Sequence, residues 1–133
     1  MSKSFTLKDS GKRQNYNSGM EREQQVQKPR FDLIIPINMP YEETLLYRWA
    51  MQMERGRVKY SNRNWEKANS IEELERFKAG AWRHFVQLMQ GDVDEDHFAA
   101  VCFNLNGMLY VMDKLNVDIN GNKKTSSKSK KTS

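Results

Sequence analysis

Apolar side chains recur at helical spacing in three stretches of the chain, and the first stretch follows Pro40. Its apolar positions fit the i, i+3, i+4 pattern of one buried stripe: Leu45, Leu46, Trp49, Ala50 and Met53. A helix is therefore predicted from just after Pro40 to about Tyr60. Glu42 and Glu43 would occupy its first turn, where the helix dipole favours acids.

Two further helices follow a loop over residues 61–70. Ser70 and Glu73 match a capping box, so the second helix is predicted to start there and to end at Gly91. Its buried face would hold Ile71, Leu74, Ala81, Phe85 and Leu88. The third helix is predicted from near Asp94 to Asp113 or Leu115. Because it is apolar almost all round from Phe98 to Met112, it is expected to be the central helix.

An arm and two polar ends complete the pattern. Residues 28–40 contain three prolines, which forbid a helix, so an extended arm is predicted. Four of its residues would anchor it across the core: Phe31, Leu33, Ile34 and Ile35. Only residues 31–37 have any strand character. Residues 1–17 and 117–133 are expected to be disordered around one domain, residues 18–116, with an all-α fold of about three main helices.

Charge changes this picture at the ends of the chain. The net charge is +5 over 133 residues, with +4 in residues 1–30, −4 in residues 31–118 and +5 in residues 119–133. The basic tail favours at most weak contact with nucleic acid. One cysteine excludes a disulfide framework, and no apolar run is long enough for a membrane span. We therefore expect a soluble, cytoplasmic protein.

Acidic residues and a histidine crowd the start of the third helix, in the stretch GDVDEDHFAAVCFN of residues 91–104. His97 and Asn104 are seven residues apart and share one stripe of that helix. If the second and third helices form an antiparallel hairpin, His84 approaches the same end. Carboxylates suit Mg²⁺ or Mn²⁺, whereas imidazole suits Mn²⁺, Zn²⁺ or Fe. A site for a divalent metal, Mg²⁺ or Mn²⁺, is predicted at Asp94, Asp96, His84 and His97.

Ordinary structural roles compete with this interpretation. Asp94 and Glu95 could simply cap a helix, and His84 could be a buried, satisfied histidine. His97 and Asn104 on an otherwise apolar helix imply a buried polar network, because buried polar groups need partners.

A second cluster is basic and aromatic: Lys59, Tyr60, Arg63, Asn64, Trp65 and Lys67. Cations neutralise phosphate and aromatic rings stack on bases, so this composition suits a nucleotide pocket. An exposed helix end with a folded-back Trp65 is the alternative. Lys28, Arg30 and Asp32 form a third polar set, which could equally be a solvated linker. Neither GxxxxGK[ST] nor GxGxxG occurs, which disfavours a P-loop or Rossmann enzyme.

Several short motifs occur in a recognisable order, namely SGMERE, KPRFDLIIP, KY, NWEK, RH and DEDHFAA followed by Asn104. In this order they resemble the small phage-encoded family described as the dATP/dGTP diphosphohydrolase N-terminal domain, over about residues 18–113. The resemblance implies a phage origin, action in the cytoplasm of the infected host cell, and hydrolysis of purine deoxynucleoside triphosphates to monophosphate and diphosphate with Mg²⁺.

By position, the resemblance assigns roles to fourteen residues. The catalytic set would be Asp94, Glu95, Asp96, His97 and His84. The substrate-binding set would be Lys28, Arg30, Asp32, Lys59, Tyr60, Asn64, Trp65, Arg83 and Asn104. A metal-dependent pyrophosphohydrolase is the first hypothesis, and a non-catalytic nucleotide-binding or protein-interaction module is the alternative. The expected partner is a nucleotide, and a homo-oligomer stays open by analogy with helical nucleotide hydrolases.

Overall fold

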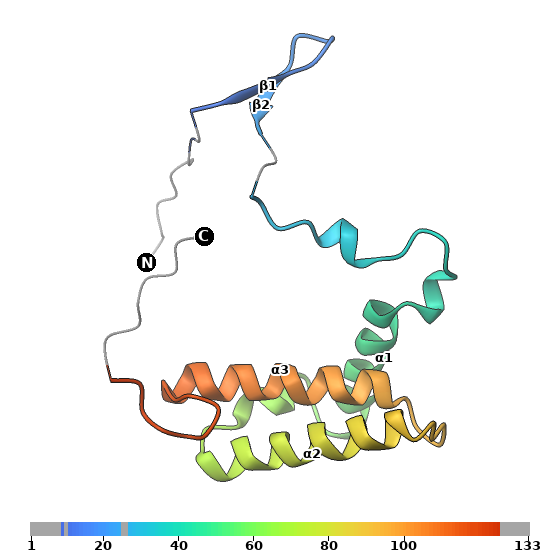
Figure 1. The fold of residues 1–133 in the computed structure, drawn as a ribbon, viewed down its shortest axis with the longest axis vertical. Helices are drawn as coiled ribbons and strands as arrows, with labels where there is room; N and C mark the ends of the chain where they lie inside the picture. The colour runs from blue at the N-terminus through green and yellow to red at the C-terminus, as the bar shows by residue number, and fades with distance from the viewer. Residues whose placement is uncertain (1–8, 10, 25–26, 126–133) are drawn as a thin grey trace. The chain divides into compact units, whose positions relative to one another are not determined.

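The computed structural model describes residues 9, 11–24 and 27–125 of the chain, and most of them are helical (Figure 1). The chain divides into two compact units, residues 1–33 and 34–133. The second unit contains α1 (Leu45–Lys59), α2 (Ile71–Met89) and α3 (His97–Leu115). The prediction of a small helical bundle is confirmed. Within the described part of the chain, none of the helices combines the length and apolar character needed to cross a membrane.

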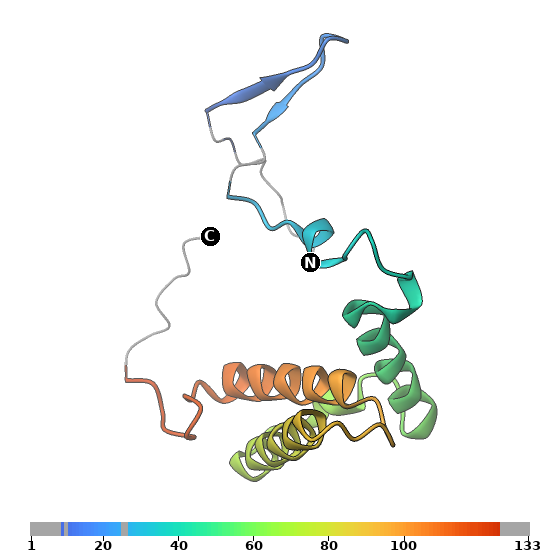
Figure 2. The same ribbon diagram turned by 45° about the vertical axis from the view of Figure 1, so that its right-hand side comes forward.

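The α2 and α3 helices form an antiparallel hairpin, and α1 packs against the first half of α3 (Figures 1 and 2). The core between the helices is small and centres on Leu74, Met108, Val111 and Val117. Because α3 contacts both neighbours and carries most of the buried residues, its prediction as the central helix is confirmed.

Two glycines set the close approach of α2 and α3. A methyl group at Gly80 would lie 2.5 Å from Asn104 Oδ1 and 2.9 Å from its Cγ. On the opposite helix, a methyl group at Gly107 would overlap the ring of Phe77. The backbones therefore approach at points where only glycine fits.

Each helix begins at a polar side chain that accepts a hydrogen bond from the backbone. Thr44 accepts from Tyr47 N, Ser70 from Glu73 N, and Asp96 from Ala99 N. The predicted capping residue Ser70 is confirmed. The predicted start of the first helix was too early, because residues Tyr41–Glu43 form a separate 3₁₀ turn and Thr44, in extended geometry, separates it from α1.

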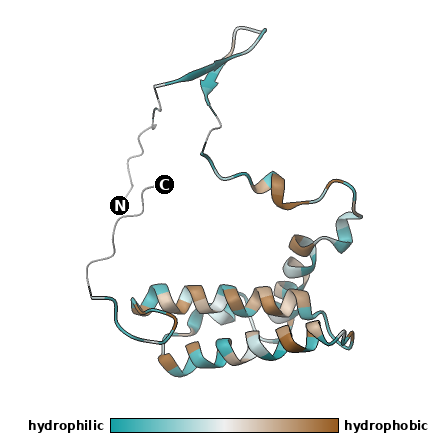
Figure 3. Ribbon diagram, viewed as in Figure 1, coloured by the Kyte–Doolittle hydropathy of each residue, from teal (hydrophilic) through white to brown (hydrophobic). Residues whose placement is uncertain are grey.

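The predicted buried stripe of α1 is only partly correct. Trp49 and Met53 are half-buried, whereas Leu45, Leu46 and Ala50 are exposed. On α2, likewise, Leu74 is buried but Ile71 and Phe85 are exposed. The apolar pattern therefore exceeds the core that the described residues form. Figure 3 shows hydrophobic positions, in brown, along all three helices.

The arm differs from its prediction. Phe31–Ile34 form a 3₁₀ turn in the space between Pro29 and Pro36 rather than an extended segment. Phe31, Leu33 and Ile34 are exposed and do not anchor in a core, so that expectation was wrong. The strand expectation for residues 31–37 was also wrong, because the one small sheet pairs β1 (Arg13–Asn15) with β2 (Glu21–Glu23) in antiparallel register.

A turn with defined hydrogen bonds follows α3, over residues 116–125. Asn116 ends the helix with φ 55°, in the left-handed region that turns the chain back. Val117 then enters the core and pairs with Lys123. Asp118 Oδ1 accepts from the backbone of Asn120 (2.9 Å) and Asn122 (3.0 Å). Residues 117–125, which we predicted to be disordered, thus form a compact turn. Arg13–Asn15, in the N-terminal segment that we also predicted to be disordered, form β1. Residues 1–8, 10 and 126–133 lie outside the described residues.

Candidate functional site

The two histidines meet where α2 and α3 come together. His84 Nδ1 lies 2.9 Å from His97 Nδ1, and His97 Nε2 lies 2.9 Å from Asp94 Oδ1. Both imidazole rings are buried, and the outer nitrogen of His84 lies 3.4 Å from an Arg83 guanidinium nitrogen. The antiparallel hairpin thus brings together residues that are 13 positions apart in the sequence.

One placement of protons satisfies all of these contacts with neutral histidines. An arginine can only donate, so His84 Nε2 accepts and His84 Nδ1–H donates to His97 Nδ1. His97 Nε2–H then donates to the Asp94 carboxylate. Burial, followed by the charge of Arg83, lowers the pKa of His84 from its ordinary value, which favours the neutral form. The chain of contacts therefore ends at a carboxylate on the surface.

The buried side chain of Asn104 has a different hydrogen-bond partner. Its Nδ2 donates to the backbone oxygen of Ala100 at 2.8 Å, and its amide packs over Gly80. In the described structure no hydrogen bond joins it to His97. The two buried polar residues of this stripe therefore have separate partners, and the predicted common network is not formed.

Asp96 faces α1 rather than the histidines. Its two carboxylate oxygens accept from Arg48 Nε and Nη2, both at 2.8 Å. Burial would raise the pKa of Asp96, but hydrogen bonds from Arg48 and the Ala99 backbone outweigh it and lower that pKa. Since Asp96 also caps α3, this ion pair fixes the start of α3 against α1.

The predicted metal ligands are consequently divided. Asp94 contacts His97, whereas Asp96 contacts Arg48. Across residues 9, 11–24 and 27–125, no group of three or more His, Cys, Asp and Glu side chains lies close enough to hold a metal ion. As they lie, Asp94, Asp96, His84 and His97 do not fit a protein-built metal site.

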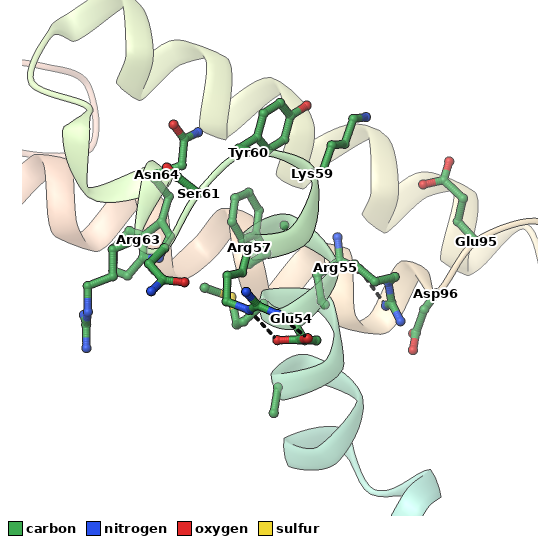
Figure 4. Close-up of a pocket in the computed structure, with 17 residues that line it drawn as sticks. Glu54, Arg55, Arg57, Lys59, Tyr60, Ser61, Arg63, Asn64, Glu95 and Asp96 are labelled. Carbon is green, nitrogen blue, oxygen red and sulfur yellow. Dashed lines mark hydrogen bonds and ion pairs between the residues drawn. The ribbon is translucent and has the colours of Figure 1, made fainter.

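A hollow of about 990 Å³ opens between α1, the loop after it and the start of α3. We call it the α1 hollow. Of the predicted residues, seven line it: Lys59, Tyr60, Arg63, Asn64, Trp65, Glu95 and Asp96. Figure 4 shows α1 carrying Arg55 and Lys59 on one side of it, with Glu95 and Asp96 on the chain that leads into α3. His84, His97 and Asp94 do not line it.

Some cations of the α1 hollow form ion pairs, whereas others contact only neutral groups. Arg57 forms two 2.8 Å hydrogen bonds with Glu54, and Arg63 is paired with Glu66. Arg55 instead donates to the neutral side chain of Gln52, and Lys59 lies 5.3 Å from the centre of the Tyr60 ring. Among the described residues, Arg55 and Lys59 form no ion pair. The charge of Arg55 helps to lower the pKa of Asp96 across the hollow, and both cations can still approach an anion bound there.

Four further predicted residues are not among those that line the hollow. Arg83 contacts His84 on α2. Arg30 is paired with Asp32 at 2.7 Å, which lowers the pKa of that carboxyl, and Lys28 is paired with Glu23 at 3.1 Å. Lys28, Arg30 and Asp32 belong to the first unit of the chain, and Asp32 lies within the 3₁₀ turn itself.

Residues 18–120 match the family described as "dATP/dGTP diphosphohydrolase, N-terminal". The chain belongs to this family. No curated protein gave a significant match, and no solved structure did. The family's description connects it with a hydrolase of purine deoxynucleoside triphosphates, and the matched range contains both the histidine pair and the whole α1 hollow.

Three arginines of this region were missed by the sequence analysis. Arg48 holds Asp96, while Arg55 and Arg57 line the α1 hollow. Helical spacing offered a signal, because Arg48, Gln52, Arg55 and Lys59 follow i, i+4, i+7 and i+11 and share one face of α1.

Proposed function

We propose that the chain binds a purine deoxynucleoside triphosphate in the α1 hollow and hydrolyses it to monophosphate and pyrophosphate. The observation that carries this proposal is the composition of the hollow. Two cations without an ion-pair partner share one concave surface with three aromatic side chains and three carboxylates, of which Glu54 is paired with Arg57 and Asp96 with Arg48. Membership of a family described by a dATP/dGTP diphosphohydrolase supports the same substrate class.

The phosphate groups would lie against Arg55 and Lys59. These residues are four apart on α1, so both side chains project from one face toward the hollow. A polyphosphate would replace the weak contacts that each makes now, with Gln52 and with the Tyr60 ring. Contacts between a cation and an ionised phosphate gain charge attraction that the present contacts with a neutral amide and a neutral ring lack.

The base would lie toward Tyr60 and Trp65. Tyr60 is exposed, and its ring can be covered by a flat ligand. Trp65 is held in place by Tyr110, with ring centres 5.2 Å apart and the planes 77° from each other. Asn64 offers both a donor and an acceptor to the edge of a base.

Glu95 is the carboxylate available for the reaction. Asp96 is engaged by Arg48 and the Ala99 backbone, whereas Glu95 is exposed at the rim of the hollow. We assign Glu95 the role of orienting a water molecule and accepting its proton as the oxygen attacks phosphorus. The phosphoanhydride bond then breaks and pyrophosphate leaves.

A requirement for Mg²⁺ or Mn²⁺ belongs to this proposal as well. Mg²⁺ is commonly held by one or two carboxylates together with substrate phosphates, rather than by a protein cage. Glu95 would be the protein ligand of an ion that arrives with the nucleotide, and such an ion neutralises phosphate charge. The phage origin and the action in an infected cell, which the resemblance implies, are part of the same proposal.

The test measures nucleotide binding and pyrophosphate release separately, for all four deoxynucleoside triphosphates, with Mg²⁺, with Mn²⁺ and with EDTA. We expect turnover of dATP and dGTP. Arg55→Gln and Lys59→Gln should each weaken binding about tenfold or more, since each removes a charge-assisted contact. The control Arg76→Gln removes an exposed cation of α2 outside the hollow and should leave binding unchanged.

Glu95→Gln separates binding from hydrolysis. We expect nucleotide binding to persist while turnover falls by about 10²-fold or more, the usual contribution of a general base. Asp92→Asn is the matched control, because Asp92 lies in the same loop but does not line the hollow. Equal turnover in Glu95→Gln and Asp92→Asn would contradict the assigned role.

Binding without turnover is the second candidate function. This function is favoured because the predicted catalytic residues are not together: Glu95 and Asp96 line the α1 hollow, whereas the buried histidine pair does not. The same experiment distinguishes the two, because a binding module shows affinity that Arg55→Gln weakens but no pyrophosphate release under any metal condition.

A further inference from the structure

A second seam of side chains runs along α2, on a face that α3 does not cover. Its members alternate four and three residues apart: Ile71, Glu75, Lys78, Trp82, Phe85 and Met89. This is the a/d spacing that lets two helices pack along their length. The seam is independent of the α1 hollow, since none of these residues lines it.

The turn after α3 covers the first half of this seam. Lys78 Nζ donates to the backbone oxygen of Ile119 at 3.0 Å, and Ile71 lies against Gly121. The second half of the seam is exposed to solvent among the described residues. Trp82 is 68% exposed and Met89 is 64% exposed, and Phe85 and Val86 between them are also exposed. We call these four residues the α2 patch.

The chemistry of the α2 patch limits what can occupy it. Its four side chains carry no charge, so it offers nothing to phosphate or to a charged ligand. The Trp82 and Phe85 rings pack edge to face with centres 6.5 Å apart, which presents a firm aromatic surface. Tryptophan is among the residues that most often anchor protein interfaces.

We infer that a second copy of this chain covers the α2 patch, with the two α2 helices packed face to face about a two-fold axis. A straight helix with the same spacing is the shape that fits the seam, and the α2 of another copy has that shape. The contact is self-complementary and closes after two copies, as an isologous interface does.

The available area sets the strength of this dimer. A buried aromatic side chain contributes roughly 150–250 Å², so the exposed parts of the four residues amount to about 450 Å² per copy. With neighbouring atoms of Ala79 and Gln90, the total for two copies is about 1,000–1,200 Å², at the lower limit of specific interfaces. We therefore expect a concentration-dependent dimer rather than an obligate one.

The helix dipoles favour an antiparallel arrangement. Each α2 carries partial positive charge at its N-terminal end and partial negative charge at its C-terminal end, and an antiparallel pair brings opposite ends together. An antiparallel pair centred between Phe85 and Val86 places Trp82 opposite Met89 of the other copy.

Sedimentation equilibrium over a concentration series tests the inference on the full chain. The weight-average mass should rise from the 15.7 kDa of one chain toward twice that value. Trp82→Glu and Met89→Glu should each raise the dissociation constant on the order of a hundredfold or more, because each change places a charge in the interface twice. Circular dichroism checks that both variants stay folded, as expected for exposed positions.

The control is Leu109→Glu, a change at an equally exposed apolar position (65%) on α3. It should leave the dimer intact. A monomer at every concentration would overturn the inference, and so would a dimer that Leu109→Glu disrupts while Trp82→Glu does not. For orientation, Val86→Cys in a Cys102→Ser background should form an intermolecular disulfide, whereas Ala79→Cys should not; the reverse would exclude the antiparallel pair.

Discussion

Replacement of Gly80 by alanine tests the close approach of α2 and α3. The added methyl group would lie 2.5 Å from Asn104 Oδ1 and 2.9 Å from Asn104 Cγ, so the buried amide must move. Overpacking of this kind costs about 1–3 kcal/mol. Loss of the hydrogen bond from Asn104 to Ala100 O adds about 1 kcal/mol, since a typical net contribution is of that size.

The gain in helix propensity offsets part of this cost. Alanine is better than glycine in a helix interior by about 1 kcal/mol. The net result expected for Gly80→Ala is therefore a loss of about 1–3 kcal/mol in the free energy of unfolding, from the combined overpacking and hydrogen-bond terms. Gly56→Ala supplies the control, because a methyl group there meets no atom within 4 Å. That variant should gain up to about 1 kcal/mol.

Urea unfolding followed by circular dichroism measures both variants. The double variant Gly80→Ala/Asn104→Ala should be more stable than the sum of the two single changes predicts, because removal of the amide makes room for the methyl group. If Gly80→Ala were as stable as Gly56→Ala, or if the two changes were strictly additive, the contact between Gly80 and Asn104 would not limit the approach of the helices.

Three further outcomes are expected. The pKa of His84 is lower in the folded chain than in the unfolded chain, so the unfolded chain binds the proton more readily. The free energy of unfolding should therefore fall as the pH drops below 6.5, the ordinary pKa of histidine. His84→Asn should reduce this dependence on pH, as measured by urea unfolding between pH 7 and 5.5. Arg48→Met should cost about 1–2 kcal/mol in urea unfolding, since it breaks a bidentate, partly buried pair with Asp96, and an unchanged midpoint would contradict that. Val117→Ala should lower stability by about 1–3 kcal/mol, whereas Ile119→Ala, on the exposed side of the same turn, should change thermal unfolding little.

The helices were predictable because their signals are local. Ser70 caps α2, and the predominance of apolar residues all round the helix from Phe98 to Met112 identifies α3 as the central element. The meeting of His84 and His97 followed from these two helices and a short connection. Periodicity fixes which residues share a face, and antiparallel packing then fixes which ends meet.

What the sequence analysis missed depends on contacts between distant residues. Arg48 and Asp96 are 48 positions apart, and the sequence near either residue contains no pattern that predicts their ion pair. Val117 follows a left-handed Asn116 and enters the core from a stretch whose composition resembles a disordered tail. The apolar pattern of α1 and α2 was read as core, although part of it lies on exposed faces. Apolar helical periodicity alone does not distinguish a face that is buried within the chain from one that stays exposed on its surface.

The turn after α3 determines where other polypeptides can be attached. Because Asn116 reverses the chain and Val117 and Lys123 pair, residue 125 leaves the hairpin beside the first turns of α2 (Figure 1). The connection between α2 and α3 lies at the opposite end, about 28 Å away for a helix of this length. A fluorescent protein or a surface tether joined after residue 125 would therefore start far from the histidine pair and from the second half of α2. The C-terminal side is the attachment point to choose for imaging or immobilisation.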